Sequence, residues 1–567
     1  MRTALVLARR GLAACLLAAV AAGGAEAADR RRLAQLIMPA VDVGEEEKAL
    51  SFAREGAGGL QLQWGSYSLE ETRSFTESLR EAAVIPPVIA VDYEGGSVHI
   101  PLTLGLLDLP SNMMLGAADD GNNTASLFYL AGRELKRAGV DMTFGPVLDV
   151  NTNPENPIIG IRSIGSDPAL VTRVGGAVMN GFRAAGIMTV MKHFPGHGAA
   201  SRDSHKVLPV IDLGPGELER DHIAPFRASA SAAPAAMTAH IIYPALDPSA
   251  PATLSSAVIR GLLREDIGFT GAVLTDSLDM KAITSYRSVP RAAVLSLKAG
   301  ADMVLIGRGD FPATLDALEA AADSGELPAY RIEEAWSRVM KLKKDYGMMD
   351  GRAEDESAFD RAYLRVSGEL SAKAVTLLAD RAGLVPLPAE YKKKRIAIIL
   401  FGPSRFSAQA LPLYKGLLHY GYEGARQYSF GISPSSREAR KILAYAREAD
   451  LLVIGSFQWA QAQNSAQTMT IRSLLGLGKP SVVVSLMNPY DSELYPEAGA
   501  VMATYGISRT SMAAAAKILS GAIEPVRAIQ AVRLHLPLPK SIYWLSTEDL
   551  KKLRRRHTLT ERQFLSG

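Results

Sequence analysis

The chain has 567 residues, long enough for more than one domain, and its 48% hydrophobic and 21% charged residues are typical of a globular protein. Its 62 Lys and Arg residues nearly balance its 59 Asp and Glu residues, so the formal charge of +3 gives no indication of a nucleic-acid partner. The single cysteine, Cys15, excludes a disulfide framework and a thiolate metal site within one chain.

The N-terminus has the pattern of an export signal. A basic start precedes an apolar stretch at residues 11–24, and residues 25–27 (AEA) fit the small-residue rule for cleavage. We therefore predict a signal peptide over residues 1–27 and a mature chain that begins near Ala28. The protein is then exported, to the periplasm or beyond, and carries no transmembrane span once the leader is removed.

Three other fates of this segment stay open. A retained membrane anchor needs an apolar run of about 20 residues, which is longer than the run found here. Residues 12–15 (LAAC) resemble a lipoprotein processing box that would anchor the chain at Cys15, although the apolar run continues beyond it. Arg9 and Arg10 are a weak signal for twin-arginine export. N-terminal sequencing of the exported protein separates these outcomes.

Eight short apolar runs recur after the leader. They lie at residues 33–41, 58–63, 88–91, 142–150, 187–191, 236–243, 272–275 and 302–306. Helical patterns separate most of them, for example at residues 122–137 and 168–185. Alternating strands and helices predict a parallel sheet, and eight such units within residues 28–345 fit a TIM-type (β/α)8 barrel, with a doubly wound open sheet as the alternative.

The alternation stops near residue 345 and resumes after a break. We assign residues 346–390 to a linker and helices, because Gly, Met and a short acidic run interrupt the pattern. A second set of strand-like runs follows at residues 396–400, 451–454, 481–484 and 500–503. These predict a separate α/β sandwich domain over residues 391–540, followed by a basic C-terminal tail at 541–567 that we interpret as solvated.

Three histidines, a lysine and an aspartate gather just after the fifth apolar run. Lys192 and His193 follow that run directly, and His197 comes after a Pro-Gly pair. Asp203 and His205 lie farther along the same polar, small-residue segment, which is typical of a loop. The carboxyl ends of the strands carry the active site in a β/α barrel, so this cluster is the first candidate.

These residues resemble the signature of family 3 glycoside hydrolases, and most of all its bacterial β-N-acetylglucosaminidase branch. The motif runs through residues 192–198 (KHFPGHG), 203–205 (DSH) and 208–209 (LP). The resemblance implies a TIM-type barrel followed by a second α/β domain. It also implies a retaining β-N-acetylhexosaminidase that acts on carbohydrates such as peptidoglycan fragments or chitooligosaccharides.

Glycoside hydrolysis needs one group that protonates the leaving oxygen and another that attacks or stabilises the anomeric carbon. The strand-like residues 272–275 stop at Asp276, and the resemblance implies that Asp276 is the nucleophile. As a residue pattern alone, Asp276 equally fits a helix N-cap. Asp279 is the second choice, and it is itself typical of a carboxylate in the first turn of a helix.

The resemblance assigns the acid/base role to a histidine, His205, with Asp203 as its partner. A histidine ordinarily titrates near ~6.5, and a carboxylate beside it favours the imidazolium and fixes its tautomer. The small residues 199–201 before this pair favour a loop that closes over substrate. The alternative is a surface-loop histidine with a local Asx turn at Asp203.

Four other polar residues match sugar-binding positions of the family: Asp92, Arg162, Lys192 and His193. A carboxylate accepts hydrogen bonds from hydroxyls and an arginine donates in a fork, so both suit a sugar. Each of the four also fits an ordinary ion pair or cap. Three further residues near strand ends are equally well interpreted as supports for these side chains: Glu94, Asp149 and His240.

The chain departs from the family pattern in two places. After Gly96 the family has an arginine directly and another a few residues on, whereas this chain continues with residues 97–100 (SVHI). The family also has Asp-Thr after the His-Gly pair, where Ala199 and Ala200 stand here. These changes leave open another glycosidic specificity, such as that of a β-glucosidase or a β-xylosidase, and a non-catalytic carbohydrate-binding protein. A glycoside phosphorylase is a separate alternative, because a histidine acid/base repels phosphate less than a carboxylate does.

A metal site is the last alternative, because His193, His197, Asp203 and His205 all have ligand side chains. A Pro-Gly pair separates the first two histidines, so they do not share a helix face as the histidines of a zinc-binding helix do. We therefore expect neither a metal nor a cofactor.

Overall fold

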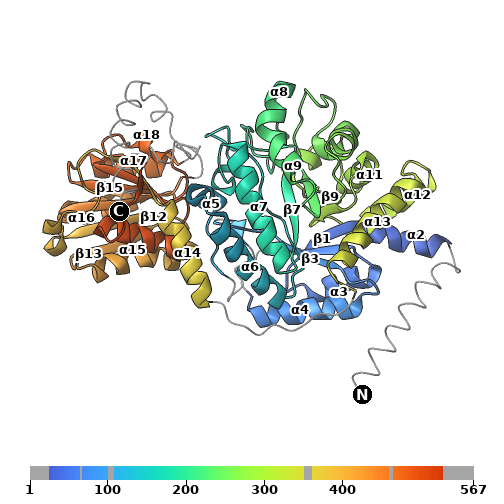
Figure 1. Cartoon of the computed structure of the whole chain (residues 1–567), viewed down its shortest axis with the longest axis horizontal. Coiled ribbons are helices and arrows are strands. Elements are labelled where there is room, and N and C mark those ends of the chain that lie inside the picture. The colour runs from blue at the N-terminus through green and yellow to red at the C-terminus, as the bar shows by residue number, and fades with distance from the viewer. Residues whose placement is uncertain are drawn as a thin grey trace, which may run out of the picture.

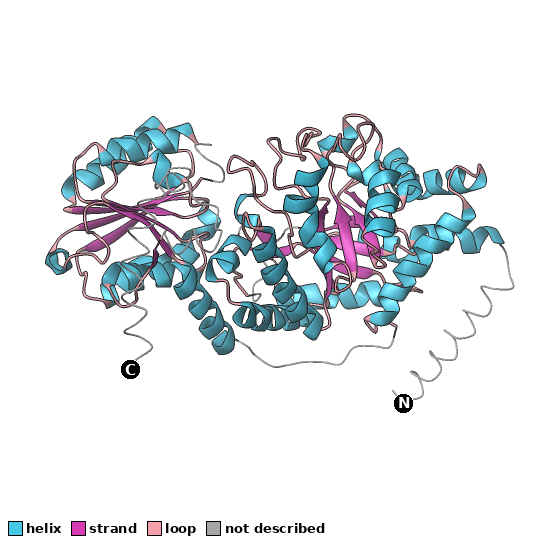
Figure 2. Cartoon of the chain, turned by 45° about the horizontal axis from the view of Figure 1, so that its top comes forward, coloured by secondary structure: helices cyan, strands magenta, loops and turns pink. Residues whose placement is uncertain are grey.

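A computed structural model of the chain describes residues 25–349, apart from 64, 66, 97 and 100–106, and residues 360–527, apart from 459–463. Two α/β units lie side by side (Figure 1). Each unit has its own set of strands enclosed by helices (Figure 2). The predicted leader up to residue 24 and the predicted basic tail lie outside the described residues.

The first unit is a ring of eight parallel strands in the order β10-β1-β2-β3-β6-β7-β8-β9. A parallel bridge between Leu274 of β9 and Met303, just before β10, closes the ring. The strands are β1 (Ile37–Val41), β2 (Gly59–Leu62), β3 (Val88–Val91), β6 (Met142–Thr143), β7 (Met188–Phe194), β8 (Ala235–Thr238), β9 (Ala272–Thr275) and β10 (Val304–Gly307). The predicted barrel is confirmed, and the open-sheet alternative is wrong.

Each predicted apolar run of this unit overlaps one strand of the ring. All residues of these strands are buried, as expected for strands covered on both faces. The bounds of β3 match the prediction, whereas β6 keeps only the first two residues of the predicted run at 142–150. β7 continues to Phe194, so Lys192 and His193 lie in the strand and not after it.

Helices cover the outside of the ring, and a short hairpin follows β3. These elements are α2 (Ala25–Ala34), α3 (Glu46–Glu55), α4 (Leu69–Ala82), β4 (Tyr93–Gly95), β5 (Val98–His99), α5 (Asn112–Ala118), α6 (Gly121–Arg137), η1 (Gly160–Arg162), α7 (Pro168–Ala184), α8 (Pro215–Glu217), η2 (Leu218–Ile223), α9 (Ala224–Ser229), η3 (Ala252–Leu254), η4 (Ala257–Asp266), α10 (Lys281–Thr284), α11 (Val289–Ala299), α12 (Phe311–Asp323) and α13 (Ala329–Asp345). In α7, the Asp167 carboxylate caps the first turn by accepting from the N–H of Leu170. Leu170, Val174 and Val178 then recur at helical spacing on its buried face.

The second unit is a seven-stranded sheet in the order β13-β12-β14-β15-β16-β11-β17, in which only the β11–β16 pairing is antiparallel. Its elements are α14 (Asp360–Ala374), β11 (Thr376–Asp380), η5 (Ala389–Lys393), β12 (Ile396–Phe401), η6 (Ser404–Phe406), α15 (Ser407–His419), β13 (Ala425–Phe430), α16 (Ser436–Glu448), β14 (Leu451–Ser456), α17 (Ser465–Leu475), β15 (Ser481–Ser485), α18 (Asp491–Leu494), β16 (Ala500–Ala503), α19 (Arg509–Ser520) and β17 (Val526–Arg527). The predicted second α/β domain is confirmed. Its sheet also includes β11, which lies in the stretch that the sequence assigned to a linker and helices.

The second unit contacts the barrel beside α5 and α6, where α14 packs against both helices. The hydroxyl of Ser111 donates to the backbone carbonyl of Tyr505 across this junction. Closer to the barrel mouth, Asn151 Nδ2 donates to the hydroxyl of Tyr490 at 3.1 Å. Asn151 belongs to the loop that follows β6, so the second unit reaches the rim on which the strands end.

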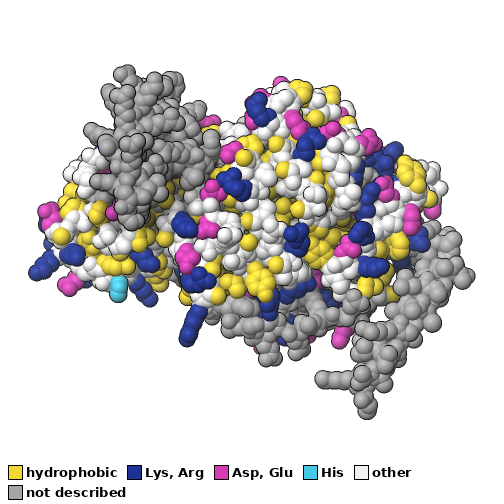
Figure 3. All heavy atoms as spheres, in the orientation of Figure 1, with side chains coloured by type: hydrophobic (Ala, Val, Ile, Leu, Met, Phe, Trp, Pro, Cys, Tyr) yellow, Lys and Arg dark blue, Asp and Glu magenta, His cyan; other side chains and the backbone are white. Residues whose placement is uncertain are grey.

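Charged side chains of both signs are interspersed on the face shown in Figure 3, with no broad basic patch among the residues drawn in colour. Elsewhere in the described chain, charged side chains form ion pairs, such as Arg291 with Glu326 at 2.6 Å. In the part of the chain that the structure describes, no helix combines the length and the apolar character needed to cross a membrane.

Candidate active site

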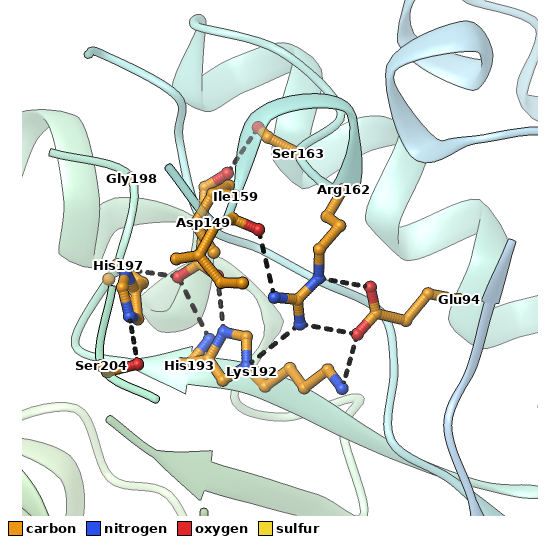
Figure 4. Close-up of polar contacts among 12 residues, drawn as sticks. Glu94, Asp149, Ile159, Arg162, Ser163, Lys192, His193, His197, Gly198 and Ser204 are labelled. Carbon is orange, nitrogen blue, oxygen red and sulfur yellow. Dashed lines mark hydrogen bonds and ion pairs between the residues drawn. The ribbon is translucent and has the colours of Figure 1, made fainter. Parts of the chain in front are cut away.

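The candidate residues of the first unit gather where its strands end. Asp92 and Glu94 follow β3, Lys192 and His193 close β7, and Asp276 follows β9. A parallel barrel brings these carboxyl ends to one rim, so residues far apart in the sequence share a site. Figure 4 shows the polar contacts that join the part of the site around Glu94, Arg162, Lys192 and His193.

Four charged side chains form a continuous group, here called the Glu94 cluster: Glu94, Arg162, Lys192 and Asp92. Arg162 binds Glu94 as a fork, with Nε and Nη2 each donating to one carboxylate oxygen at 2.8 Å. Lys192 Nζ lies 2.7 Å from Glu94 Oε1 and 2.8 Å from Asp92 Oδ1. The Glu94 side chain is fully buried, whereas that of Asp92 keeps 22% of its surface exposed.

Glu94, Arg162 and Lys192 remain charged at working pH. Burial alone would raise the pKa of Glu94, but Arg162 and Lys192 outweigh burial and lower that pKa to about 2. Burial opposes the charge of Lys192, and the neighbouring carboxylates of Asp92 and Glu94 raise its pKa above the ordinary value. Two cations and two carboxylates are therefore fixed in place in the absence of a ligand. The ion pairs that were the alternative interpretation of Asp92, Arg162 and Lys192 are present.

His193 is oriented by Asp149, which lies in the loop after β6. His193 Nδ1 donates to Asp149 Oδ2 at 2.7 Å, and the other carboxylate oxygen accepts from the backbone N–H groups of His193 and His197. These contacts lower the pKa of Asp149 to about 2, although burial acts in the opposite direction. The other ring nitrogen of His193, Nε2, lies 3.5 Å from Arg162 Nη2.

Asp276 directly follows β9, and its carboxylate accepts from the N–H of Ser277 at 2.7 Å. Burial would raise its pKa, but the imidazoles of His193, His240 and His205 lower it to about 2. Asp276 is thus ionised at working pH, as an attacking carboxylate must be. The next helix, α10, begins only at Lys281, so the predicted alternative of a helix N-cap at Asp276 is wrong.

Asp279, the second choice for the nucleophile, has a different place. Its carboxylate accepts from the hydroxyl of Ser277 at 2.7 Å and from the N–H of Arg308 at 3.0 Å. It lies before α10 and not in its first turn, so the expected dipole contact is absent. Asp279 therefore ties the loop after β9 to the segment that follows β10.

His240 holds the same loop from the end of β8. Its Nε2 donates to the backbone carbonyl of Ser277 at 3.0 Å, and its Nδ1 lies 2.8 Å from the hydroxyl of Thr253. Burial lowers the pKa of His240 below its usual value, and the Thr253 hydroxyl beside Nδ1 donates to the backbone carbonyl of Ala239 at 3.0 Å. His240 thereby fixes the backbone next to Asp276, in the supporting position that the sequence analysis considered.

Asp203 and His205 form the expected pair in the loop after β7. His205 Nδ1 donates to Asp203 Oδ1 at 2.9 Å, and the backbone N–H of His205 donates to the same oxygen at 2.9 Å. The pair and the Asx turn, considered as alternatives, therefore occur together. The His205 side chain is 55% exposed, and its loop meets the segment after β9, where the backbone N–H of Ala282 donates to the carbonyl of Ser204 at 3.3 Å.

A family model, the N-terminal domain of glycosyl hydrolase family 3, matches residues 29–342, which is more than half of the chain. The chain belongs to glycoside hydrolase family 3. Beta-hexosaminidase A of Pseudoalteromonas piscicida is 30% identical over 482 residues, which cover 76% of this chain and 80% of that protein. Beta-hexosaminidase LpqI of Mycobacterium tuberculosis is 34% identical over 325 residues, covering 55% of this chain and 82% of that protein.

A solved structure extends the likeness to both units. The family 3 β-N-acetylglucosaminidase from Paenibacillus sp. superposes with a TM-score of 0.80 at 30% identity, covering 88% of this chain and 97% of that one. Together these relatives identify the family 3 chain as a glycosidase.

Glycines of the family 3 motifs bring loops unusually close to the strand ends. A Cβ at Gly198 would lie 1.7 Å from the carbonyl oxygen of Val150, so only glycine fits there. Gly95 has a φ of +96°, and a Cβ would lie 2.1 Å from the carbonyl oxygen of Pro110. The segment after Gly96 departs from the family pattern by lacking its arginines. Within this segment, residues 97 and 100 lie outside the described residues.

Two supporting residues of the family 3 site were not singled out for their role from the sequence. Asn156 Nδ2 donates to the carbonyls of His197 and Gly198 at 3.0 and 3.1 Å and so holds the loop after β7. Thr253 reaches His240 from the segment after β8. An Asn-Pro pair at 156–157 is a turn signal, but no sequence feature marks Thr253.

Among the described residues, no cluster of three or more His, Cys, Asp and Glu side chains is arranged to hold a metal ion. His193 and His197 instead each contact Asp149, and His205 pairs with Asp203. We expect any activity of the chain to be insensitive to strong chelators.

Proposed function

We propose that this protein is a retaining β-N-acetylhexosaminidase that removes β-linked N-acetylglucosamine from glycans. The observation that carries the proposal is an ionised carboxylate at a strand end, Asp276, within electrostatic reach of a histidine paired with an aspartate. The names of the similar proteins, β-hexosaminidases and a β-N-acetylglucosaminidase, support the choice of sugar.

In the first step, Asp276 attacks the anomeric carbon as the bond to the leaving oxygen breaks. His205, as the imidazolium, gives its proton to that oxygen, and a glycosyl ester with Asp276 forms. Asp203 supports the cation, because its carboxylate accepts from Nδ1 and leaves Nε2–H as the donor. The depressed pKa of Asp203 keeps it ionised: burial opposes this, but the hydrogen bonds and charge of His205 prevail.

In the second step, neutral His205 takes a proton from water. The hydroxide equivalent attacks the anomeric carbon, the ester bond to Asp276 breaks, and the sugar leaves with its original β configuration. One proton has then moved from water to the leaving group through His205, and the enzyme returns to its starting state.

The sugar rests on the Glu94 cluster and His193. Asp92 accepts from sugar hydroxyls, Arg162 and Lys192 donate, and His193 contacts a hydroxyl through Nε2. Because Glu94 and Asp149 already fix the cations and the imidazole, little side-chain freedom is lost when the sugar binds.

The test is a hydrolysis panel on the mature chain with N-acetylglucosaminides, glucosides and xylosides, each with and without phosphate. N-acetylglucosaminide hydrolysis in the wild type, lost in Asp276→Asn and His205→Ala, is the expected result. Phosphate-dependent release of a sugar phosphate would instead make the enzyme a phosphorylase. Glycan binding by the folded wild type without turnover would make it a binding protein.

A slow fluorinated hexosamine donor tests the nucleophile directly. It should form a stable adduct that mass spectrometry of a proteolytic digest places on Asp276. An adduct on Asp279 or on any other residue would overturn the assignment.

We further propose that the enzyme works outside the cytoplasm on peptidoglycan fragments or chitooligosaccharides. The export pattern of residues 1–27 supports this location. N-terminal sequencing of the exported protein should find a start near Ala28, and a lipid-modified Cys15 would indicate anchoring in its place.

A further inference from the structure

Ser204 is buried, although the two residues that follow it in the loop are exposed. It keeps 2% of its surface, whereas the side chains of its neighbours His205 and Lys206 are 55% and 80% exposed. A serine between two members of a catalytic pair has no role in the chemistry set out above. Its burial shows that the loop is docked through this residue.

Two contacts hold Ser204, and they come from different strand ends. Its hydroxyl lies 3.0 Å from Nε2 of His197, in the segment after β7 (Figure 4). Its backbone carbonyl accepts from the N–H of Ala282 at 3.3 Å. Ala282 is in α10, a few residues beyond Asp276, so Ser204 joins the acid/base loop to the segment that carries the nucleophile.

His197 is itself immobilised. Its backbone N–H donates to Asp149 at 2.6 Å, and its carbonyl accepts from Asn156 at 3.0 Å. Its ring packs edge-on against that of His193, with 5.7 Å between centroids. Burial lowers the pKa of His197 to about 4, so the ring is neutral at working pH.

The Ser204 hydroxyl is the only polar partner that the described residues offer to the His197 ring, because Nδ1 is buried without one. Loss of the hydroxyl would leave both ring nitrogens of a buried imidazole unpaired. A buried polar group without a partner is costly, so the hydrogen bond favours the docked loop over a lifted one.

We propose that Ser204 and His197 are positioning residues that latch the loop carrying Asp203 and His205 over the nucleophile, which rests on the function proposed above. The latch acts on acid/base catalysis only. Without it the loop spends less time docked, His205 is less often in place to protonate the leaving oxygen, and the sugar site on the barrel floor is unchanged.

The test compares two substrates in Ser204→Ala. When chitobiose is the substrate, the departing sugar oxygen needs a proton. When a 2,4-dinitrophenyl glycoside is the substrate, the dinitrophenolate leaves without one. We expect kcat/KM for chitobiose to fall about tenfold and kcat/KM for 2,4-dinitrophenyl N-acetylglucosaminide to change by less than about twofold. A merely structural loss would lower both values together, and that result would overturn the proposal.

Two further variants sharpen the test. Ser201→Ala changes an exposed serine of the same loop and should leave both substrates unaffected. In a His205→Ala background, Ser204→Ala should cause no further loss, because the latch has no acid left to position. A full additional tenfold loss in that background would contradict the latch.

Limited proteolysis gives a readout that does not depend on turnover. Arg202 and Lys206 are exposed trypsin sites on either side of the dyad. Ser204→Ala should be cleaved there several times faster than wild type and Ser201→Ala, at an unchanged thermal midpoint. Equal cleavage rates would refute the latch, even if the wild type has hexosaminidase activity. Faster cleavage of Ser204→Ala in a protein that has no such activity would support the latch and refute the proposed function.

Discussion

The floor of the active site and the acid/base loop are built in opposite ways. The floor consists of the Glu94 cluster and His193. Within it, the fully buried Glu94 side chain accepts two hydrogen bonds from Arg162 and pairs with Lys192. In the loop, His205 is more than half exposed and its ring contacts Asp203, a neighbour in the same loop. The floor is therefore a fixed template for the sugar, and the loop is a separate part that docks through few contacts.

This difference assigns ground-state binding to one region and proton transfer to the other. Binding energy is best supplied by groups already in place, because ordering them on binding would cost affinity. An acid/base that serves both the leaving group and water benefits from a loop that can admit and release them. Substitutions in the two regions should then differ in kind as well as in size.

The largest effect is expected from Asp276→Asn, which lies between the two regions. The amide cannot form the glycosyl ester, so kcat should fall by at least about 10⁴-fold for every substrate, whatever its leaving group. Steady-state kinetics with chitobiose and with the dinitrophenyl glycoside measures this. A loss confined to chitobiose would mean that Asp276 acts as the acid and not as the nucleophile.

His205→Ala should cost less and should discriminate between leaving groups. General acid catalysis contributes about 10²–10⁴-fold, so kcat/KM for chitobiose should fall within that range. The dinitrophenyl glycoside needs no proton and should retain most of its kcat/KM. Equal losses of kcat/KM for the two substrates would point to another acid.

The third prediction compares a carboxylate-to-amide substitution on the floor with the same substitution in the loop. Glu94→Gln leaves Arg162 and Lys192 buried with one carboxylate fewer, so the free energy of unfolding should drop by about 3 kcal/mol and KM should rise. Asp203→Asn, the matched change in the exposed loop, should alter stability by less than about 0.5 kcal/mol while lowering kcat. Urea unfolding and kinetics on both variants measure this, and equal stability losses would refute the contrast.

The sequence predicted most of the fold because the barrel strands and four strands of the second sheet are short apolar runs. Strand β13 was not predicted, because it is an edge strand that contains partly or fully exposed polar residues such as Arg426 and Gln427. Strand β17 has only two residues, too few for any pattern. A strand that is covered on both faces leaves a clear signal, and an edge strand does not.

The site was predictable only as far as local motifs reach. Each candidate residue could be named from its motif, but its partner could not, because the partner is set by strand order. Glu94 meets Arg162 across 68 positions of sequence, and Ser204 meets Ala282 through a backbone contact that no side-chain pattern encodes. Distances within loops, such as that between Asp203 and His205, follow from the sequence far more directly.

The last prediction concerns the acid stability of the floor. The pKa values of Glu94 and Asp149 fall to about 2 on folding, below their ordinary values of 4.5 and 3.8. A carboxyl whose pKa is depressed contributes stability above its unfolded pKa and loses it as pH falls through the folded one. Wild-type stability should therefore decline between about pH 4.5 and 2. Glu94→Gln should flatten that decline, whereas Asp203→Asn should leave most of it unchanged. Urea unfolding midpoints measured across this pH range test both expectations. A flatter decline in Asp203→Asn than in Glu94→Gln would place the acid-sensitive charges in the loop.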